Sequence, residues 1–447
     1  MCPIDPEFFD EDAVRAALAD RDIGRLFCLL RRVGLSQRRI AELTGQSQSE
    51  VSEILHGRQV LNIRLLERIA DGFSMHRARM GLSYCEDTPP AAKEVTEPTK
   101  RRTLIAAGMT TALRQATHPL VEPRHLALPA AEPLPPHLDL SHVRAVRLAT
   151  DHLRAMARHQ GGQGTLFTDA VAHYTRWMHV PAPDAIKALL AAALAELHTE
   201  AGWSCYDSGM DGSGHFTRAM AFADQAGDAY GIAKAAWSAG ATLVRTGHPN
   251  DALKLFQCGQ LCLSGTRLRK PTAATPRPDD PRLPILTAYL ALNSGTAYAV
   301  MQGHDQATQC LTEAHDGWAP RDAFERGGMD RATAAIQLDL GQLDTAEHLA
   351  ATAVRDYGEG NRRDRTMAKL LHAEIHIRAR ESQGLALAHH ALTEVRTLHS
   401  VAARRERLIP LATALATHPS TDARELARAA HNIATYGTSE AVPPTNI

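Results

Sequence analysis

The feature that most constrains the fold of this 447-residue chain is a spacing of small and large residues that recurs in its C-terminal two thirds. From Gly240, residues that suit close helix packing follow at offsets of 3, 12, 16 and 19. The same offsets recur from Gly295, from Ala334 and, with a poorer fit, from His376. The four sets are Gly240, Leu243, Ala252, Phe256 and Gly259; Gly295, Tyr298, Ala307, Leu311 and Ala314; Ala334, Gln337, Ala346, Ala350 and Ala353; and His376, Ala379, Ala388, Leu392 and Val395. Such repetition predicts a repeated pair of helices.

A steric argument explains these offsets. A small residue on each of two helices lets the pair cross closely, and the large residues fill the groove beside them. Stacked pairs then bury a continuous core that one pair could not bury alone. The spacing resembles the tetratricopeptide pattern, which implies an α-solenoid over residues 141–435. Residues 196–228 have a similar composition but not the same register. An Ala-rich helical bundle without true repeats is the alternative.

The stretch from Gly34 to Arg58, GLSQRRIAELTGQSQSEVSEILHGR, predicts two short helices joined by a tight turn. Ser36 and Ser47 suit the N-caps of these helices, and Gly45 suits the positive φ of the turn. Helical spacing of apolar residues extends this prediction on both sides, with a first helix at about residues 22–32 and a last one ending near residue 72. The expected core comprises Ile23, Leu26, Phe27, Leu30, Ile40, Leu43, Val51, Ile54, Leu55, Ile63, Leu66 and Ile69. We therefore expect an all-α chain that begins with a domain of four or five helices in residues 1–82.

Once this apolar face points inward, polar residues face outward at the start of the second helix of the pair. Gln can pair with adenine through two hydrogen bonds in the DNA major groove, and Ser can contact several bases. Residues 21–80 contain eleven Arg against six acidic residues, although the whole chain has a net charge of −1. This local basic surface favours a nucleic-acid partner. The predicted DNA contacts are Gln37, Arg38, Arg39, Ser47, Gln48, Ser49, Ser52, Glu53 and Arg58.

The segment from Asp22 to Met75 resembles the helix-turn-helix domain of phage repressor and Cro-like regulators, also called xenobiotic-response-element-type regulators. The stretch quoted above and the closing LLERIADGF carry the resemblance. It implies a phosphate contact from Gln37 and base contacts from Gln48, Ser49 and Ser52. Gln46 departs from the family, which usually buries an aliphatic residue just after the turn glycine. The architecture with a C-terminal repeat domain resembles actinobacterial and other Gram-positive regulators of quorum sensing and antibiotic pathways, whose repeat domains bind peptides or small signals.

Residues 83–140 are rich in proline and charge, which predicts a linker. Within it, residues 100–113 (KRRTLIAAGMTTAL) imitate a twin-arginine export signal, but they lie far from the N-terminus, and we expect a short apolar helix instead. A proline-rich loop is expected at residues 263–284 and a disordered tail at 436–447. Seven scattered cysteines suit reduced thiols, and no apolar stretch is long enough to span a bilayer, so we expect a cytoplasmic protein with no membrane partner.

The concave surface of a solenoid can bind peptides, partner helices or small molecules. Aromatic residues of the C-terminal region are candidates for lining this surface, although each of them, taken alone, is more often a core residue. The predicted effector contacts are Trp203, Tyr206, Trp237, Tyr298 and Trp318, with Tyr289 as a further candidate.

Three short motifs resemble chemical sites without meeting their requirements. His372 and His376 lie four residues apart, as zinc ligands can, but the metalloprotease pattern needs Glu directly after the first His. With 23 histidines in the chain, such a pair arises by chance, so no metal is expected. Cys258 and Cys262 suit a buried thiol pair, with redox sensing as the alternative. The GGQG at residues 161–164 lacks the Lys-Ser/Thr of a phosphate loop. We therefore expect neither an enzyme nor a cofactor.

These patterns together predict a sequence-specific transcriptional regulator that binds a palindromic operator in double-stranded DNA as a homodimer. We expect a small molecule or peptide, bound in the repeat region, to modulate operator binding. A protein-interaction scaffold with a vestigial DNA-binding domain is the alternative, and an enzyme in the helical region is a second one.

Overall fold

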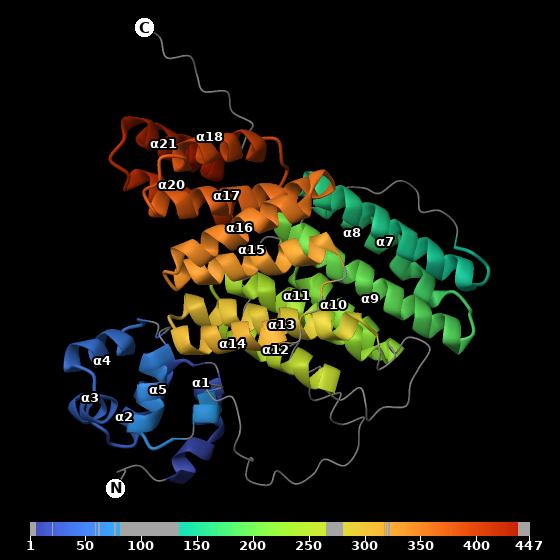
Figure 1. The fold of residues 1–447 in the computed structure, drawn as a ribbon. Coiled ribbons are helices and arrows are strands. Elements are labelled where there is room, and N and C mark those ends of the chain that lie inside the picture. Colours follow the sequence, from blue (N-terminus) through green and yellow to red (C-terminus); the bar gives the residue numbers. More distant parts are fainter. Residues whose placement is uncertain are drawn as a thin grey trace.

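The structure, a computed structural model, describes residues 6–80 and 134–436, except residues 20, 59, 61, 62, 76, 265–279, 317, 319 and 321. Over these residues the fold is all-α, as predicted. The helices form an N-terminal domain and a larger C-terminal region, which lie against each other (Figure 1). Within the described part of the chain, no helix combines the length and the apolar character needed to cross a bilayer.

The N-terminal domain has the helices that the sequence predicts between residues 22 and 72, together with a helix before them. Its elements are η1 (Pro6–Asp10), α1 (Asp12–Ala19), α2 (Ile23–Arg32), α3 (Gln37–Thr44), α4 (Gln48–Leu55), α5 (Ile63–Gly72) and η2 (Arg77–Met80). Every predicted core residue whose side chain is described is buried, except that Leu43 and Leu55 are partly exposed. Phe8 and Phe9, which precede α1, join the same core.

Local capping explains where α3 and α4 begin. The Ser36 side chain accepts a hydrogen bond from the backbone N–H of Arg39 at 3.2 Å. The Ser47 hydroxyl accepts from the backbone N–H of Glu50 at 3.2 Å, and the Glu50 carboxylate accepts from the Ser47 N–H at 2.8 Å, which completes a capping box. Gly45 ends α3 with a φ of 63°, a conformation that glycine adopts without steric cost.

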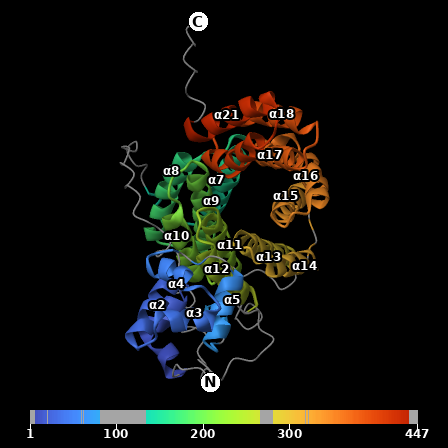
Figure 2. The ribbon, with the colours of Figure 1, turned by 90° about the vertical axis from the view of Figure 1, so that its left-hand side faces the viewer.

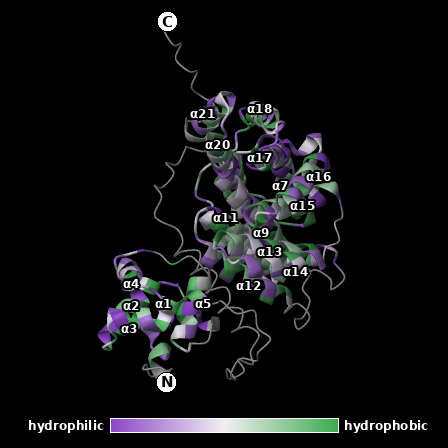
Figure 3. Ribbon diagram, turned by 60° about the vertical axis from the view of Figure 1, so that its left-hand side comes forward, coloured by the Kyte–Doolittle hydropathy of each residue, from purple (hydrophilic) through white to green (hydrophobic). Residues whose placement is uncertain are grey.

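The C-terminal region is a stack of helical hairpins. The paired helices are α9 with α10, α11 with α12, α13 with α14, α15 with α16, α17 with α18 and α20 with α21. Their bounds, with those of the preceding and intervening elements, are α7 (Leu140–Gln160), α8 (Gly164–Thr175), η3 (Arg176–His179), α9 (Asp184–Asp207), α10 (Ser213–Ala226), α11 (Ala229–Arg245), α12 (Pro249–Ser264), α13 (Arg282–Val300), α14 (His304–Asp316), α15 (Ala323–Asp339), α16 (Leu343–Tyr357), η5 (Glu359–Asn361), α17 (Arg362–Arg378), α18 (Gly384–Val395), α19 (Val401–Ala403), the π-helical turn η6 (Arg404–Leu408), α20 (Ile409–Ala416) and α21 (Thr421–Tyr436). In Figure 3, hydrophobic and hydrophilic stretches alternate along many of these helices, as amphipathic packing requires.

The small residues at the recurring offsets lie where the paired helices cross. A Cβ added at Gly240 on α11 would stand 2.4 Å from Cε1 of Phe256 on α12, so only glycine fits there. Gly202 on α9 stands against Phe216 on α10 in the same way, at 2.5 Å. The two partners are 14 residues apart in the second case and 16 in the first. The α9–α10 hairpin therefore belongs to the stack although it does not share the register.

The stack closes into a ring instead of remaining an open solenoid. The first helix of each hairpin contacts the first helix of the next, in the order α9, α11, α13, α15 and α17, and α7 contacts both α9 and α17. Figure 2 shows these helices curving around a centre. We refer to residues 134–436 as the helical ring. The sequence predicted the hairpins but not this closure, because the contact between α7 and α17 joins residues more than 200 positions apart.

A buried carboxylate forms the seam where the ring closes. One oxygen of Asp207, at the end of α9, accepts a hydrogen bond from the backbone N–H of Gly162 at 2.8 Å. The other oxygen accepts from the Ser400 hydroxyl at 2.6 Å and from Nη2 of Arg363 at 2.6 Å. Burial opposes the charge of Asp207, but Arg363 and these hydrogen bonds hold its pKa below the usual value.

Several predicted segments lie wholly or mostly outside the described residues. They are the linker at 83–140 with its apolar helix, the loop at 263–284 and the tail at 436–447. At the end of the expected linker, the backbone N–H of Leu138 donates to the carbonyl of Pro181 at 3.2 Å, and the Leu138 side chain is buried. The expected loop ends at Arg282, where α13 begins.

Candidate nucleic-acid interface and central cavity

The N-terminal turn of α4 presents the polar side chains that the sequence predicts as base contacts. Gln48, Ser49 and Glu53 are exposed and Ser52 is half-buried, in the presence of the whole helical ring. The Ser47 hydroxyl caps the helix and lies 3.0 Å from the Ser49 hydroxyl. Ser47 is therefore already engaged by its own helix, whereas Gln48 and Ser49 face solvent at the helix end that attracts anions.

The arginines predicted as phosphate contacts are exposed and paired with carboxylates. Nε of Arg38 lies 3.1 Å from Oε1 of Glu42, and Nη1 of Arg39 lies 2.9 Å from its Oε2. Arg58 pairs with Glu53 at 2.6 Å. Arg39 first and then Arg38 hold the pKa of Glu42 below its usual value. Because exposed ion pairs are weak, phosphate groups can replace these carboxylates at little cost. Figure 3 shows α3, which carries Arg38 and Arg39, as largely hydrophilic. Gln37, the first residue of α3, is half-buried.

Gln46 occupies the buried position after the turn glycine with a polar side chain. Its exposed fraction is 8%, and its amide oxygen accepts a hydrogen bond from the Thr44 hydroxyl at 2.9 Å. The Thr44 hydroxyl also lies 2.8 Å from the carbonyl oxygen of Ile40, so its single proton is shared between the two acceptors. Among the described residues, Nε2 of Gln46 has no hydrogen-bond partner. The fold thus tolerates a polar residue after the turn glycine by pairing half of the amide.

Sequence patterns gave no indication of the contact that joins the N-terminal domain to the helical ring. Arg21, between α1 and α2, is buried, and its φ of 52° is uncommon for a residue other than glycine. Its Nε donates to the carbonyl of Met80 at 2.6 Å, and its Nη1 donates to Oδ1 of Asn250 on α12. Nη1 also lies 3.8 Å from Sδ of Met301. Burial lowers the pKa of Arg21 to about 10. A buried cation thus anchors the N-terminal domain on the ring.

A second polar contact and a shared core reinforce this junction. Nε2 of Gln306 on α14 donates to Oε1 of Glu67 on α5 at 2.9 Å. The apolar residues of the N-terminal domain and those of α10 to α14 form one continuous buried cluster. The orientation of the helix-turn-helix is therefore tied to the α12–α14 part of the ring.

The inner helices of the ring surround a cavity of about 1010 Å³. Its lining comes mainly from α7, α9, α11, α13, α15 and α17, and includes eight cationic and nine acidic side chains. Trp203, Trp237 and Tyr289 also line it. A surface with both charges and several aromatic rings suits a polar molecule with an aromatic or apolar part better than a purely apolar one.

The charges of the cavity pair with one another at its wall. Arg154 on α7 lies 2.7 Å from Glu196 and 3.1 Å from Glu200 on α9, and Lys234 on α11 lies 3.3 Å and 3.2 Å from the same two carboxylates. Lys234 and then Arg154 lower the pKa of Glu196 to about 2. Burial opposes the charge of Lys234, but Glu196 and Glu200 raise its pKa to about 12. This network could have been anticipated from the sequence, because Glu196 and Glu200 place two carboxylates on one face of an otherwise Ala- and Leu-rich helix.

Of the predicted effector contacts, Trp203, Trp237 and the further candidate Tyr289 line the cavity, whereas Tyr206, Trp318 and Tyr298 are not among its lining residues. The rings of Trp203, Trp237, Tyr289 and Trp318 follow one another with centroid distances of 6.1, 5.3 and 5.8 Å. Tyr206 reaches the cavity indirectly, since its hydroxyl donates to Oε1 of Glu406 at 2.9 Å. Tyr298 is 1% exposed and belongs to the hydrophobic core. The prediction for Tyr298 therefore needs correction, because its ring is enclosed by core residues and cannot meet a molecule in the cavity.

Several polar atoms of the cavity wall lack a partner. Within the described part of the chain, Ser204 Oγ, Asp228 Oδ1, Trp237 Nε1 and Ser238 Oγ are buried without a hydrogen bond. Burial also raises the pKa of Asp228. Native proteins rarely leave such groups unpaired, and these four atoms all belong to residues that line one cavity.

Of the three short motifs that resemble chemical sites, the GGQG at residues 161–164 joins α7 to α8, and the cysteine pair lies on α12. Cys258 and Cys262 are both half-buried and unbridged. Burial raises the pKa of Cys258, which disfavours the reactive thiolate. His372 and His376 share a face of α17, as predicted, and their surroundings are described below.

Comparison with known proteins gives one match. A family model described as a helix-turn-helix domain matches residues 22–80, which span α2 to η2. The chain matches no curated protein and no solved structure. The fold and the sequence thus agree that residues 22–80 form a helix-turn-helix domain.

Proposed function

We propose that this protein is a transcriptional regulator that binds double-stranded DNA through its helix-turn-helix domain. The observation that carries the proposal is the exposed polar start of α4, at the position that follows the turn of a matched helix-turn-helix domain. In a Cro-like arrangement, Gln48, Ser49 and Ser52 contact base edges in the major groove, and Gln37 contacts a phosphate. Arg38, Arg39 and Arg58 exchange their carboxylate partners for phosphates.

The regulator acts as a homodimer on a palindromic operator. One helix-turn-helix reads only a few base pairs, and a two-fold pair of such domains reads half-sites about 34 Å apart. The junction at Arg21 supports a role for the helical ring in setting this spacing, because it fixes the recognition helix relative to the ring.

The ring, a tetratricopeptide-like domain, binds the signal that modulates operator binding. Its cavity is large enough for a small molecule or a short peptide. The unpartnered polar atoms and the row of aromatic rings support a ligand there. Helices α11 and α13 contribute to the cavity, while Asn250 and Gln306 on the neighbouring α12 and α14 hold the N-terminal domain. A ligand that prefers one shape of the ring would therefore shift the orientation of the recognition helices.

We also propose that the ring is not an enzyme. The carboxylates of Glu196 and Glu200, in the cavity wall, are paired with Arg154 and Lys234. This pairing serves structure and ligand recognition better than acid–base catalysis, which needs a group that exchanges its proton near the working pH.

Operator binding tests the proposal directly. Genomic fragments selected by the full chain yield the operator, and its affinity is then measured for single variants. Gln48→Ala and Ser49→Ala should each weaken operator binding by about 1–3 kcal/mol for a good base contact. Arg38→Ala should weaken binding to all sequences and reduce the salt dependence. Arg15→Ala, an exposed arginine on α1 paired with Asp12, is the matched control.

Failure of this test has a defined meaning. If the protein binds no duplex even at low salt, or if Gln48→Ala binds the selected operator as tightly as the wild type, the protein is an interaction scaffold with a vestigial domain.

The effector role is tested separately. Small molecules are released from protein purified from its own cells, and operator affinity is measured before and after they are added back. Trp237→Ala should remove the difference, whereas Trp177→Ala, outside the cavity lining, should retain it. Equal affinity in both conditions would exclude the effector role.

A further inference from the structure

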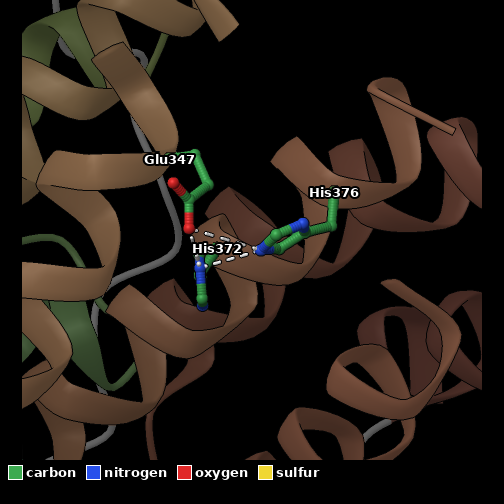
Figure 4. Close-up of side chains that lie close together, drawn as sticks. All are labelled: Glu347, His372 and His376. Atoms are coloured by element: carbon green, nitrogen blue, oxygen red, sulfur yellow. Dashed lines mark hydrogen bonds and ion pairs between the residues drawn. The ribbon is translucent and has the colours of Figure 1, made fainter. Parts of the chain in front are cut away.

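Three side chains from two successive hairpins meet where α16 packs on α17, and none of them lines the central cavity. Glu347 lies in the second turn of α16, and His372 and His376 lie on one face of α17 (Figure 4). Nε2 of His372 stands 2.9 Å from Nε2 of His376 and 3.3 Å from Oε1 of Glu347. The same carboxylate oxygen stands 3.7 Å from Nε2 of His376. Three donor atoms of the kinds that bind transition metals thus point toward one another.

The spacing of these atoms fits a tetrahedral ion. Zn²⁺ binds nitrogen and oxygen ligands at about 2.0–2.2 Å, so neighbouring ligand atoms of a tetrahedron lie about 3.3–3.6 Å apart. The three observed distances, 2.9, 3.3 and 3.7 Å, bracket this range. Small movements of the side chains would therefore suffice to centre an ion between them.

The second ring nitrogen of His376, Nδ1, also has surroundings that favour metal binding. Its Nδ1 contacts Oε2 of Glu381, and because a carboxylate accepts, Nδ1 carries the proton. Its Nε2 then presents a lone pair toward Glu347 and His372. Nε2 of Gln383 donates to the same oxygen of Glu381 at 3.2 Å and lies 3.3 Å from Nδ1 of His376. A carboxylate that holds the second nitrogen of an imidazole is the usual support of a metal-binding histidine.

The exposure of the three side chains gives the ion a path and leaves room for a further ligand. The side chain of His376 is 2% exposed, that of His372 is 16% exposed and that of Glu347 is 40% exposed. The cluster is therefore buried at His376 and open to water at Glu347. A water molecule can complete the coordination from the open side.

We propose that Glu347, His372 and His376 bind one divalent transition-metal ion, with Zn²⁺ as the ion that best suits two imidazoles and one carboxylate. Mg²⁺ and Ca²⁺ suit this site poorly, because both prefer oxygen ligands. The bound ion links α16 to α17 and so fastens one hairpin of the ring to the next. This site could not be predicted from the sequence, because Glu347 precedes His372 by 25 residues. Only the packing of α16 on α17 places Glu347 beside the two histidines.

Metal titration of the untagged full chain tests the proposal. After chelator treatment and dialysis, Zn²⁺ uptake is measured by equilibrium dialysis with elemental analysis. The wild type should bind one ion per chain tightly. Glu381→Gln should weaken binding by about 10–100-fold, as expected for loss of a supporting carboxylate. Glu347→Gln and His372→Ala, which remove a ligand, should weaken it at least as much. His389→Ala, an exposed histidine on α18, is the matched control and should bind as the wild type does.

A stability measurement separates loss of the ion from loss of the fold. Glu347→Gln changes a partly exposed side chain and should retain the helix content of the wild type by circular dichroism. Zn²⁺ should raise the midpoint of thermal unfolding of the wild type but not that of this variant, because an ion that binds only the folded chain stabilises it. The proposal is overturned if the wild type takes up no tightly bound Zn²⁺, or if Glu347→Gln and His372→Ala bind it as the control does. The three side chains would then form a hydrogen-bonded cluster only.

Discussion

The N-terminal domain and the helical ring use polar side chains in opposite directions. In the N-terminal domain, Gln48, Ser49 and Arg38 face outward from short helices that are held by local caps. In the ring, Glu200 and Lys234 face inward from helices that enclose a cavity. The first arrangement suits a partner too large to be enclosed, and the second suits a partner that is surrounded.

Ion pairs show the same contrast. In the pair of Arg38 with Glu42, the side chains are 82% and 46% exposed, so water and salt weaken the attraction. In the pair of Arg154 with Glu200, they are 19% and 18% exposed. Removal of one member of a surface pair therefore affects partner binding more than stability, whereas removal of one member of an interior pair leaves a buried charge.

The largest effect on stability is expected at the seam of the ring. Asp207→Ala leaves Arg363 buried without its principal carboxylate and removes the acceptor of Ser400 and Gly162. We expect a loss of about 3–5 kcal/mol in the free energy of unfolding, measured by urea denaturation. Asp12→Ala, at a surface pair whose carboxylate is 94% exposed, should cost about 1 kcal/mol or less. Similar losses in the two variants would remove the contrast between the domains.

The second largest loss of stability is expected where two helices of the ring cross closely, at Gly240. Gly240→Ala places a Cβ 2.4 Å from the Phe256 ring and should cost about 1–3 kcal/mol of unfolding free energy through overpacking. Gly214→Ala, at a position on α10 with no atom within 4 Å of the added Cβ, should be neutral or stabilising by up to about 1 kcal/mol. A neutral Gly240→Ala would show that the recurring offsets do not reflect close crossing.

Acid should act on the ring through His198. Its side chain is fully buried on α9, near His215, and burial first, then His215, lower its pKa from 6.5 to about 3. The unfolded chain therefore takes up the proton first, so the stability due to neutral His198 is complete above about pH 6.5 and falls as the pH falls. Between pH 7 and 5 the wild type should lose about 2 kcal/mol more of unfolding free energy than His198→Gln. Parallel losses in urea titrations at both pH values would contradict this assignment.

The smallest effect on stability is expected at the proposed DNA contacts. Gln48→Ala should change the unfolding free energy by about 0.5 kcal/mol or less, because its side chain is exposed and makes no contact that its helix requires. The same variant should lose operator binding, as stated above. A large loss of stability in this variant would mean that Gln48 supports the fold and that the outward face of α4 has a structural role.

How much the sequence revealed depends on how far apart the interacting residues lie. The helices of the N-terminal domain were predictable, because Ser36, Gly45 and Ser47 satisfy backbone groups within a few residues of themselves. The hairpins of the ring were predictable from recurring small residues, although the register of α9–α10 was not. Three features could not be predicted from the sequence, because each joins distant segments. They are the seam at Asp207, the junction at Arg21 and the cluster around Glu347.

The candidate sites follow the same rule. The outward residues of α4 could be assigned once the apolar face of one short helix was known. Aromatic residues of the ring could be chosen only by type, so Trp203 and Trp237 fall on the cavity while Tyr298 falls in the core. The arrangement of six inner helices decides which ring faces the centre, and no local pattern encodes that arrangement.

The position of Asp207 also sets the order in which the protein can be assembled on the ribosome. Its partners Arg363 and Ser400 are synthesised more than 150 residues later, so the early hairpins cannot complete their carboxylate network until the last ones emerge. Open repeat arrays can lose their end units piecemeal, whereas here the contact of α7 with α17 joins the first and last inner helices. Such a protein should melt in a single cooperative step and form more slowly than an open array of equal length.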